Sequence, residues 1–194
     1  MSWHDDQSWE KAWWNNCTNT FFEELKQIHY VKRMGLKAEQ TPDGKYPVFD
    51  FKGKSVIDLG GGSVSLLLKC INVRNPVVVD PLDYPQWTMD RYKTAGIDFV
   101  QMKAEDIKLT GFDEVLIYNL LQHTENPEKI IKNARKIAKV IRIFEWIDHG
   151  VMPGHPQDLK EDKLNEWLGA KGKVERIIIG SMDCGMSYSG VFKT

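Results

Sequence analysis

Between Ser55 and the end of the chain, short runs rich in valine and isoleucine alternate with segments whose apolar residues recur at helical intervals. Buried parallel strands have such continuous apolar runs, and the helices between them are the crossovers that parallel strands need. The pattern therefore predicts a doubly wound, mostly parallel α/β sheet. The last two strands have no helix between them, so we expect one of them to run antiparallel at or near the sheet edge. The expected strands span 55–59, 76–80, 97–101, 113–118, 140–145, 174–179 and 186–192, and the expected helices span 63–72, 87–95, 127–138 and 160–169.

The helix expected over 127–138 shows its orientation most plainly. Its apolar residues fall on one face and its lysines on the opposite face, as in a helix that packs on a core. A row of lysines is usually a solvated surface, and we prefer this interpretation to a nucleic-acid surface. The apolar residues are Ile130, Ile131, Ala134, Ile137 and Ala138, and the lysines are Lys129, Lys132, Lys136 and Lys139.

The N-terminal part is helical in pattern and unusually aromatic. Residues 20–34 carry apolar side chains at helical intervals, and Gly35 follows as a C-cap. We expect residues 1–40 to form a helical cap or lid on a core of residues 53–194, within one domain. A break is expected at Asn15-Asn16 and a turn at residues 42–44.

Five aromatic or basic side chains of the expected cap are candidates for either packing or ligand contact. Trp9 and Trp13 lie one helical turn apart and are expected to pack in the core. Trp14, Lys26 and Tyr30 are the candidates for closing over a cofactor or an acceptor.

Charge and composition narrow the possible partners. The chain has 26 basic and 27 acidic residues, a balance that favours neither nucleic acid nor an anionic membrane as a partner. No apolar run approaches the roughly 20 residues of a membrane span, and the acidic, polar N-terminus does not resemble a signal peptide. Three cysteines without a C-x-x-C spacing suit reduced packing residues better than disulfides or a zinc site. We therefore expect a cytoplasmic protein.

The stretch 55-SVIDLGGGSVSLLLKC-70 runs from a buried strand into three glycines, as nucleotide-binding folds do. A dinucleotide would put its pyrophosphate beside these glycines, where Asp58 would repel it, and Ser65 stands where the fingerprint has its third glycine. The ammonium group of S-adenosylmethionine would instead be attracted by Asp58. Asp80 ends the next strand 22 residues later, near the spacing expected for an acid that binds ribose hydroxyls.

Several motifs between Lys54 and Glu145 resemble those of class I S-adenosylmethionine-dependent methyltransferases, especially the compact small-molecule type. The motifs are D-L-G-G-G at 58–62, V-V-V-D at 77–80, A-E-D-I at 104–107, F-D-E-V at 112–115 and L-L-Q-H-T-E-N-P-E-K at 120–129. The resemblance implies a Rossmann-like sheet of seven strands with the last strand inserted antiparallel. It also implies S-adenosyl-L-methionine as the cofactor and a small molecule as the methyl acceptor.

The resemblance further implies roles for individual residues around that cofactor. Asp58 and the glycines would surround its methionine part, with Asn119 and Leu120 beneath. Asp80 would hold the ribose. Leu82 or its neighbour Pro81 would pack on the adenine, and the 104–106 turn would meet the adenine edge. The implied cofactor residues are Asp58, Gly60, Gly61, Gly62, Asp80, Pro81, Leu82, Ala104, Glu105, Asp106, Asn119 and Leu120.

Two family features are missing from the chain. The lysine-proline-glycine-glycine turn usual before the fifth strand is absent, which leaves the cofactor loops untouched. The N/D-P-P-Y/F motif is absent after the fourth strand, where the chain reads Tyr118-Asn119-Leu120-Leu121. The second difference argues against methylation of an adenine or glutamine amino group.

Histidines beyond the fourth and fifth strands are the candidates for chemistry on the acceptor. His123 is placed where a general base would be useful, with hydrogen bonding of its loop as the alternative role. In 145-EWIDHGVMPGHPQ-157 the candidates for contact with the acceptor are Glu145, Asp148, His149 and His155, together with Trp146, although His155 could simply orient the following turn. The spacing of acids and histidines there matches no zinc pattern, so no metal is expected.

Methyl transfer to the oxygen or nitrogen of a small molecule is the function that this sequence favours. The first alternative is an NAD-type oxidoreductase, which Asp58 and Ser65 disfavour. The second is a cofactor-binding protein without catalysis.

Overall fold

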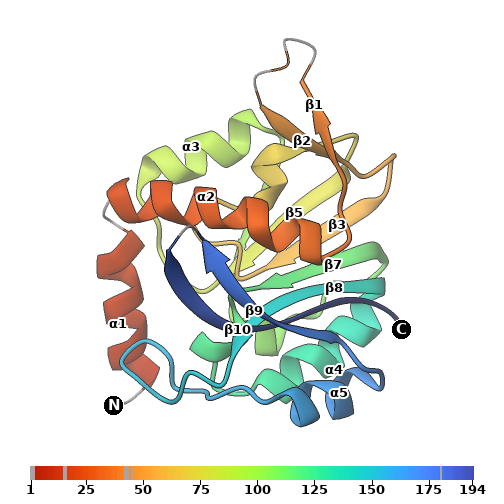
Figure 1. Ribbon diagram of the computed structural model, residues 1–194. Coiled ribbons are helices and arrows are strands. Elements are labelled where there is room, and N and C mark those ends of the chain that lie inside the picture. Colours follow the sequence, from red (N-terminus) through yellow and green to blue (C-terminus); the bar gives the residue numbers. More distant parts are fainter. Residues whose placement is uncertain (1–2, 15–16, 42–43, 45, 180) are drawn as a thin grey trace.

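The computed structural model describes residues 3–14, 17–41, 44, 46–179 and 181–194, without the side chains of residues 3–4, 17–20, 179 and 182 (Figure 1). The break expected at Asn15-Asn16 therefore lies outside the described residues. So do Pro42 and Asp43 of the expected turn, and the side chain of Cys17.

A seven-stranded sheet forms the centre of the molecule, as predicted. Neighbouring strands from β6 to β8 pair in parallel, and β10 pairs antiparallel with both β8 and β9. The antiparallel strand is thus inserted beside the sheet edge, which is β9. Across the sheet the order is β6 (Asp98–Gln101), β5 (Arg74–Asp80), β3 (Ser55–Leu59), β7 (Phe112–Tyr118), β8 (Ala138–Ile147), β10 (Met182–Lys193) and β9 (Lys173–Ile179).

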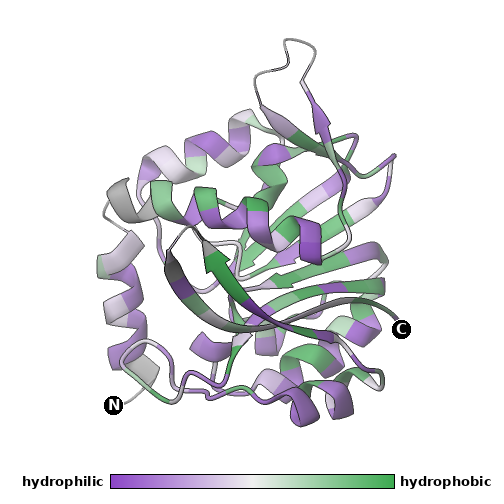
Figure 2. Cartoon of the chain, in the orientation of Figure 1, coloured by the Kyte–Doolittle hydropathy of each residue, from purple (hydrophilic) through white to green (hydrophobic). Residues whose placement is uncertain are grey.

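Helices cover both faces of this sheet (Figure 1). Tyr30 and Val31 of α2 (Cys17–Arg33) and Tyr92 of α3 (Gln86–Thr94) belong to the apolar core on one face. The core on the other face is completed by α4 (Pro127–Ile137) and α5 (Glu161–Leu168). Figure 2 shows the central strands largely hydrophobic, in contrast to the hydrophilic helix α1 (Trp3–Trp14). This is the architecture of a doubly wound sheet, with the expected N-terminal helices present.

The orientation predicted for α4 is confirmed. The Asn126 side chain caps its N-terminus by accepting a hydrogen bond from Lys129 N at 2.9 Å. The apolar face is fully buried, and all four lysines of the row are exposed. Ala138 already belongs to β8, which follows the helix without a loop.

The helix predicted over 63–72 is wrong. One 3-10 turn, η1 (Leu66–Lys69), follows the glycines, and Cys70–Ile71 forms β4. This short strand pairs with β2 (Pro47–Asp50), which also pairs with β1 (Ala38–Gln40) in a separate three-stranded sheet. Pairing with β2 therefore outweighs the helix propensity of the leucine run, because Cys70 and Ile71 cannot belong to a strand and to a longer helix at once.

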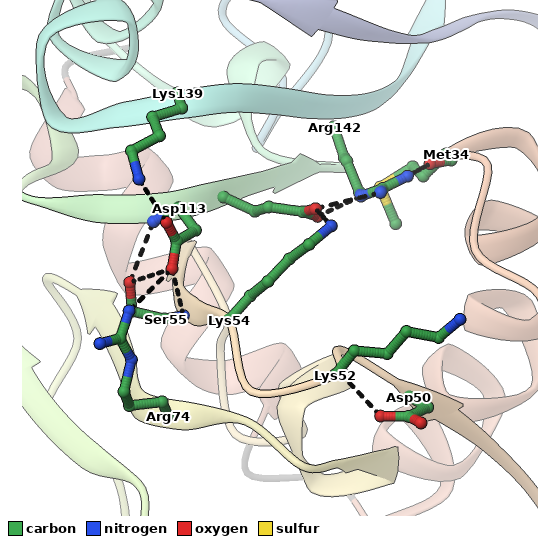
Figure 3. A network of polar contacts seen from close by, with 10 residues as sticks. Met34, Asp50, Lys52, Lys54, Ser55, Arg74, Asp113, Lys139 and Arg142 are labelled. Atoms are coloured by element: carbon green, nitrogen blue, oxygen red, sulfur yellow. Dashed lines mark hydrogen bonds and ion pairs between the residues drawn. The ribbon is translucent and has the colours of Figure 1, made fainter.

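The amino-terminal end of the large sheet carries a network of ion pairs (Figure 3). Glu114 of β7 is buried and accepts hydrogen bonds from Lys54 and Arg142. Burial would raise the pKa of Glu114, but these two cations outweigh it and the pKa is lowered. Arg142 also donates to the Met34 carbonyl oxygen at 2.6 Å, which ties α2 to this end of the sheet.

None of the described helices is long and apolar enough to cross a membrane.

Candidate active site

A cavity of about 260 Å³ opens at the carboxyl ends of β3, β5 and β7. In parallel sheets this edge is where ligands bind. Most of the residues proposed from the sequence line it, namely Gly60, Gly62, Asp80, Pro81, Leu82, Ala104, Glu105, Asn119, Leu120, His123, Trp14, Lys26, Trp146 and His155. The residues proposed from the sequence that do not line it are Asp58, Gly61, Asp106, Tyr30, Glu145, Asp148 and His149.

The glycine loop presents backbone to this cavity. Gly60 and Gly62 have φ of +71° and +62°, a conformation that other residues adopt only at a cost. A Cβ on Gly60 would overlap the Leu120 side chain, and one on Gly62 would approach the Trp14 ring at 3.6 Å. The Tyr92 hydroxyl donates to Gly62 O at 2.7 Å and fixes the loop from behind. The conformation therefore favours glycine at both positions, and at Gly60 the space beside Leu120 requires it as well.

Asp80 lines the cavity at the end of β5. Its carboxylate accepts hydrogen bonds from Gly62 N at 3.1 Å, Leu82 N at 3.0 Å and the Tyr84 hydroxyl at 3.1 Å. Burial raises the pKa of Asp80 to about 6, against the lowering effect of these donors. Asp80 thus joins the glycine loop to the following turn and still faces the cavity as an acceptor.

Asp58 lies behind the glycine loop instead of facing the cavity. Because side chains alternate along a strand, Asp58 shares the sheet face of Val56, which packs in the core beneath α2 and α3. Its Oδ2 accepts hydrogen bonds from Ser65 Oγ and, at 2.7 Å, from the Tyr118 hydroxyl. Burial raises the pKa of Asp58 to about 7, and Oδ1 has no hydrogen-bond partner among the described residues. Direct contact with a ligand ammonium, as expected from the sequence, is not available to a carboxylate in this position.

The end of β7 forms the floor of the cavity. Asn119 adopts a left-handed conformation with φ of +50°, and Leu120 N and Leu121 N both donate to Glu145 Oε1 at 3.1 Å. Burial raises the pKa of Glu145 to about 7 despite these two donors. Glu145 does not line the cavity, so its observed role is to hold the 119–121 backbone in place.

The two acids of the 104–106 turn differ in position. Glu105 lines the cavity, and its Oε1 accepts hydrogen bonds from Glu125 N at 3.1 Å and Asn126 N at 3.3 Å. Asp106 is largely exposed and pairs with Lys129 at 3.1 Å. Of the three residues of this turn, Ala104 and Glu105 therefore line the cavity and Asp106 does not.

Helix α1 closes the opposite wall with tryptophans. Trp9 and Trp13 stack with ring centroids 5.4 Å apart and line the cavity, so the expectation that they pack in the core is wrong. The glycine at position 154 leaves room for the Trp9 ring, because a Cβ there would lie 2.8 Å from it. The Trp14 indole donates to Glu10 Oε2 at 3.2 Å.

The two α2 residues proposed as lid candidates, Lys26 and Tyr30, differ in their access to the cavity. Lys26 lines the cavity and pairs with Glu23 at 3.1 Å. Tyr30 is 1% exposed and stacks on Phe144 with ring centroids 4.2 Å apart. Tyr30 is therefore a core residue, because packing against β8 leaves it no access to the cavity.

Three histidines gather at one end of the cavity. The ring centroids of His123 and His155 are 4.6 Å apart, and those of His149 and His155 are 5.2 Å apart. His149 Nε2 lies 3.1 Å from Gln122 Oε1, outside the cavity lining. Burial and the charge of His123 lower the pKa of His155 to about 4, so His155 is neutral near pH 7.

His123 has protein partners on both ring nitrogens. Nδ1 lies 2.6 Å from Gly154 O and 3.1 Å from Glu10 Oε1, and Nε2 lies 3.2 Å from Gln122 Nε2. Burial would lower the pKa of His123, but Glu10 and the Gly154 carbonyl outweigh it and the pKa is raised. Within the described residues, no group of three histidines, cysteines or acids is arranged to hold a metal ion.

Sequence reasoning missed most of the wall that α1 supplies. The lining residues it did not propose are Gln7, Trp9, Glu10, Trp13, Glu23, Val79, Tyr84, Lys103, Gln122 and Thr124. For Tyr84 and Gln122 a signal existed, since they lie in the same strand-end segments as Asp80 and His123. No comparable signal singled out Gln7 or Glu10, because nothing local links α1 to the sheet edge.

The order of strands, the inserted antiparallel strand and a glycine loop at the carboxyl edge define a Rossmann-like methyltransferase fold. Residues 57–140 match the family model described as a methyltransferase domain. No curated protein matches the chain.

Solved structures match larger parts of the chain. A chain of the Haloferax volcanii complex between the Trm112 methyltransferase activator and its assigned methyltransferase is 12% identical, with TM-score 0.66, over 94% of this chain and 96% of its own. A SAM-dependent methyltransferase from Aquifex aeolicus is 16% identical, with TM-score 0.53, over 84% and 87%. The mitomycin 7-O-methyltransferase MmcR is 15% identical, with TM-score 0.54, over 76% of this chain and 51% of its own.

The chain thus spans about half the length of the mitomycin enzyme, and identities this low establish the fold alone. Together with the family match, they confirm the resemblance noted in the sequence. The match to the methyltransferase-domain model covers residues 57–140 of the 194, and the fold is one that S-adenosylmethionine-dependent methyltransferases share.

Proposed function

We propose that the protein transfers a methyl group from S-adenosylmethionine to an oxygen or nitrogen atom of a small molecule. The observation that carries this proposal is one cavity with two unlike walls. The wall from the sheet edge presents the glycine loop and Asp80. The wall from α1, the turn after β7 and the 150–155 loop presents tryptophans, His123 and His155. The first suits the cofactor and the second an acceptor.

The residues of the first wall fit the chemistry of this cofactor. Gly60 and Gly62 leave room for close approach to backbone, and Asp80 and Glu105 are buried acceptors for its hydroxyl and amino groups. When bound, the cofactor supplies a methyl group on a positively charged sulfur. Buried acids around the cavity suit a cationic ligand better than a pyrophosphate, which argues against the NAD-type alternative.

The residues of the second wall fit a small acceptor with an apolar face. Trp9, Trp13, Trp14 and Trp146 can pack on such a face and exclude water, which helps to align the acceptor atom with the methyl group. His123 would take the acceptor proton. Because its pKa is raised above the usual 6.5, base catalysis by His123 would increase as the pH rises through that raised pKa.

The same proposal treats residues 1–40 as a cap on the 53–194 core, within one cytoplasmic domain. The contacts of α1 with the cavity support it, since removal of this helix would open the acceptor wall to solvent.

Two measurements test the proposal. S-adenosylhomocysteine should raise the Tm and bind with a measurable heat, whereas NAD should do neither. Transfer of a labelled methyl group should then be screened over phenols, hydroxylated metabolites and amines. Stabilisation by NAD alone would overturn the assignment. Tight binding of S-adenosylhomocysteine without methyl transfer to any acceptor would favour a cofactor-binding protein without catalysis.

A further inference from the structure

Glu10 of α1 is a buried acid that the sequence analysis did not single out. It is 8% exposed and lines the cavity. Its Oε2 accepts the hydrogen bond of the Trp14 indole at 3.2 Å, and its Oε1 lies 3.1 Å from His123 Nδ1. Among the described residues Oε1 has no hydrogen-bond partner, so its contact with His123 is a close approach that becomes an ion pair when the ring is protonated. Burial of a carboxylate costs free energy, because the charged group loses its hydration.

The segment around Gly154 holds Glu10 and His123 together. Gly154 O lies 2.6 Å from His123 Nδ1, and Gly154 N donates to Asp6 Oδ1 of α1 at 3.0 Å. The Trp9 ring packs against the same glycine, which has φ of +79°. Docking of α1 on this loop therefore brings the Glu10 carboxylate and the Gly154 carbonyl to the same ring nitrogen.

The two acceptors on one side of the ring decide where its proton lies. A neutral imidazole carries one N–H, and both Glu10 Oε1 and Gly154 O are acceptors that favour it on Nδ1. Nε2 is then left with its lone pair, which accepts from the Gln122 side-chain amide at 3.2 Å. This is the arrangement in which a carboxylate orients a histidine so that its other nitrogen acts as the base.

We propose that Glu10 is the positioning residue of His123: by its contact with Nδ1 it keeps Nε2 available as the base, so that docking of α1 completes the catalytic group. The proposal rests on the proposed function. The acceptor O–H or N–H displaces the Gln122 amide from Nε2. Its proton passes to Nε2, while the bond from the acceptor atom to the methyl carbon forms and the sulfur–carbon bond breaks.

Other charged groups face His123 and must be considered with Glu10. The 148–158 loop contributes His149 and His155, and β8 contributes Glu145, whose charge also raises the pKa of His123. Lys26 of α2 lines the same cavity. Glu10 is the acid in direct contact, so its removal should change the titration of His123 more than any of these.

The test is an NMR pH titration of the histidine ring protons, with His123 assigned from the signal that a His123→Gln variant loses. In Glu10→Gln the apparent pKa of His123 should fall by about one unit or more, as expected when an adjacent opposite charge is removed. Asp5→Asn is the matched control, since it removes an exposed acid from the same helix and leaves the contact between Asp6 and Gly154 in place. It should shift this pKa by less than about a third as much. An unchanged His123 titration in Glu10→Gln, or an equal shift in Asp5→Asn, would overturn the proposal.

A second measurement on the unmodified protein avoids dependence on the folding of a variant. Ring ¹⁵N shifts of neutral His123 should show the proton on Nδ1, and a proton on Nε2 would overturn the proposal. Binding of S-adenosylhomocysteine is measured separately by calorimetry. A protein that fails to bind it while His123 behaves as expected would contradict the proposed function but leave the Glu10 contact supported.

Discussion

Acids at the two ends of the large sheet have pKa values shifted in opposite directions. At the carboxyl end, burial raises the pKa values of Asp58, Asp80 and Glu145 to about 7, 6 and 7. Their hydrogen-bond donors are neutral hydroxyl and backbone groups. Among the described residues, no lysine or arginine forms an ion pair with any of the three.

At the amino-terminal end the acids are paired. Lys54 and Arg142 lower the pKa of Glu114, and Lys139, with Ser55 and Arg74, lowers the pKa of Asp113 (Figure 3). Each carboxylate is thus held in its charged form by cations at the same end of the sheet.

This difference assigns stability to the acids at the amino-terminal end of the sheet and function to those at the carboxyl end. An acid whose pKa is lower in the folded than in the unfolded protein stabilises the fold at pH values above its unfolded pKa. An acid whose pKa is higher in the folded protein destabilises the fold as the pH rises from its unfolded pKa to its folded pKa. Burial of unpaired acids is tolerated at the carboxyl end, where strongly perturbed pKa values are typical of functional sites. We therefore expect substitutions at the two ends to have opposite signatures.

The largest effect should come from Glu114→Gln. It leaves Arg142 and Lys54 without their counter-charge at a buried position, and breaking a buried ion pair in this way costs about 3 kcal/mol. For a chain of this size the Tm should fall by about 10 °C, as measured by thermal and urea unfolding. Affinity for S-adenosylhomocysteine should stay within about twofold, because the change lies at the opposite end of the sheet. A large loss of affinity would contradict the separation of the two ends.

Gly60→Ala tests the carboxyl end directly. The new Cβ would overlap Leu120 and force a left-handed conformation on alanine, so we expect calorimetry to show at least a tenfold loss of affinity, about 1.4 kcal/mol. Gly96→Ala is the matched control, since Gly96 has φ of +68° and a Cβ added there would meet no described atom within 4 Å. It should lower the Tm through the same backbone strain and leave affinity unchanged. Equal losses of affinity in both variants would show that strain alone is responsible.

Asp58→Asn should stabilise the protein at alkaline pH. Both hydrogen bonds to Asp58 end on Oδ2, so an amide can keep them while the buried charge disappears. The folded pKa of about 7 exceeds the usual 3.8, so the stability that the protonated carboxyl contributes is complete below about pH 4 and lost as the pH rises through 7. At pH 8 the variant should therefore be more stable by at least about 1 kcal/mol, or about 3 °C in Tm, with about 4 kcal/mol as the upper limit set by the full pKa shift. At pH 4 the gain should vanish. A gain that persists at pH 4 would show that the charge of Asp58 is not its cause.

The architecture was predictable because its signals are local and repeated. The valine and isoleucine runs of β3, β5 and β7 are buried on both sheet faces, and α4 carries a full apolar stripe. Asp80 lines the cavity, since a residue at the end of a parallel strand lies at the ligand-binding edge of the sheet.

The remaining features depend on contacts between distant parts of the chain. The helix expected after the glycines is replaced by a strand that pairs with β2, and the N-terminal helix meets the site through Asp6 and Gly154, which are 148 residues apart. The position of Asp58 follows from the two-residue alternation of β3, which turns its side chain towards Tyr118 instead of the cavity.

The smallest expected effect belongs to Asp113→Asn, and its sign is opposite to that of Asp58→Asn. Asp113 pairs with Lys139 at 2.7 Å and with Arg74 at 3.0 Å near the surface, where ion pairs contribute little and salt screens them. Because the folded pKa is lowered, its contribution is present above about pH 4 and lost as the pH falls. At pH 8 the Tm of Asp113→Asn should drop by about 1 to 3 °C, and by less in high salt. At the same pH, Asp58→Asn should raise the Tm. Thermal unfolding of the two variants at pH 4 and pH 8 therefore compares the two ends of the sheet in one experiment, and a shift of the same sign in both at pH 8 would refute the contrast.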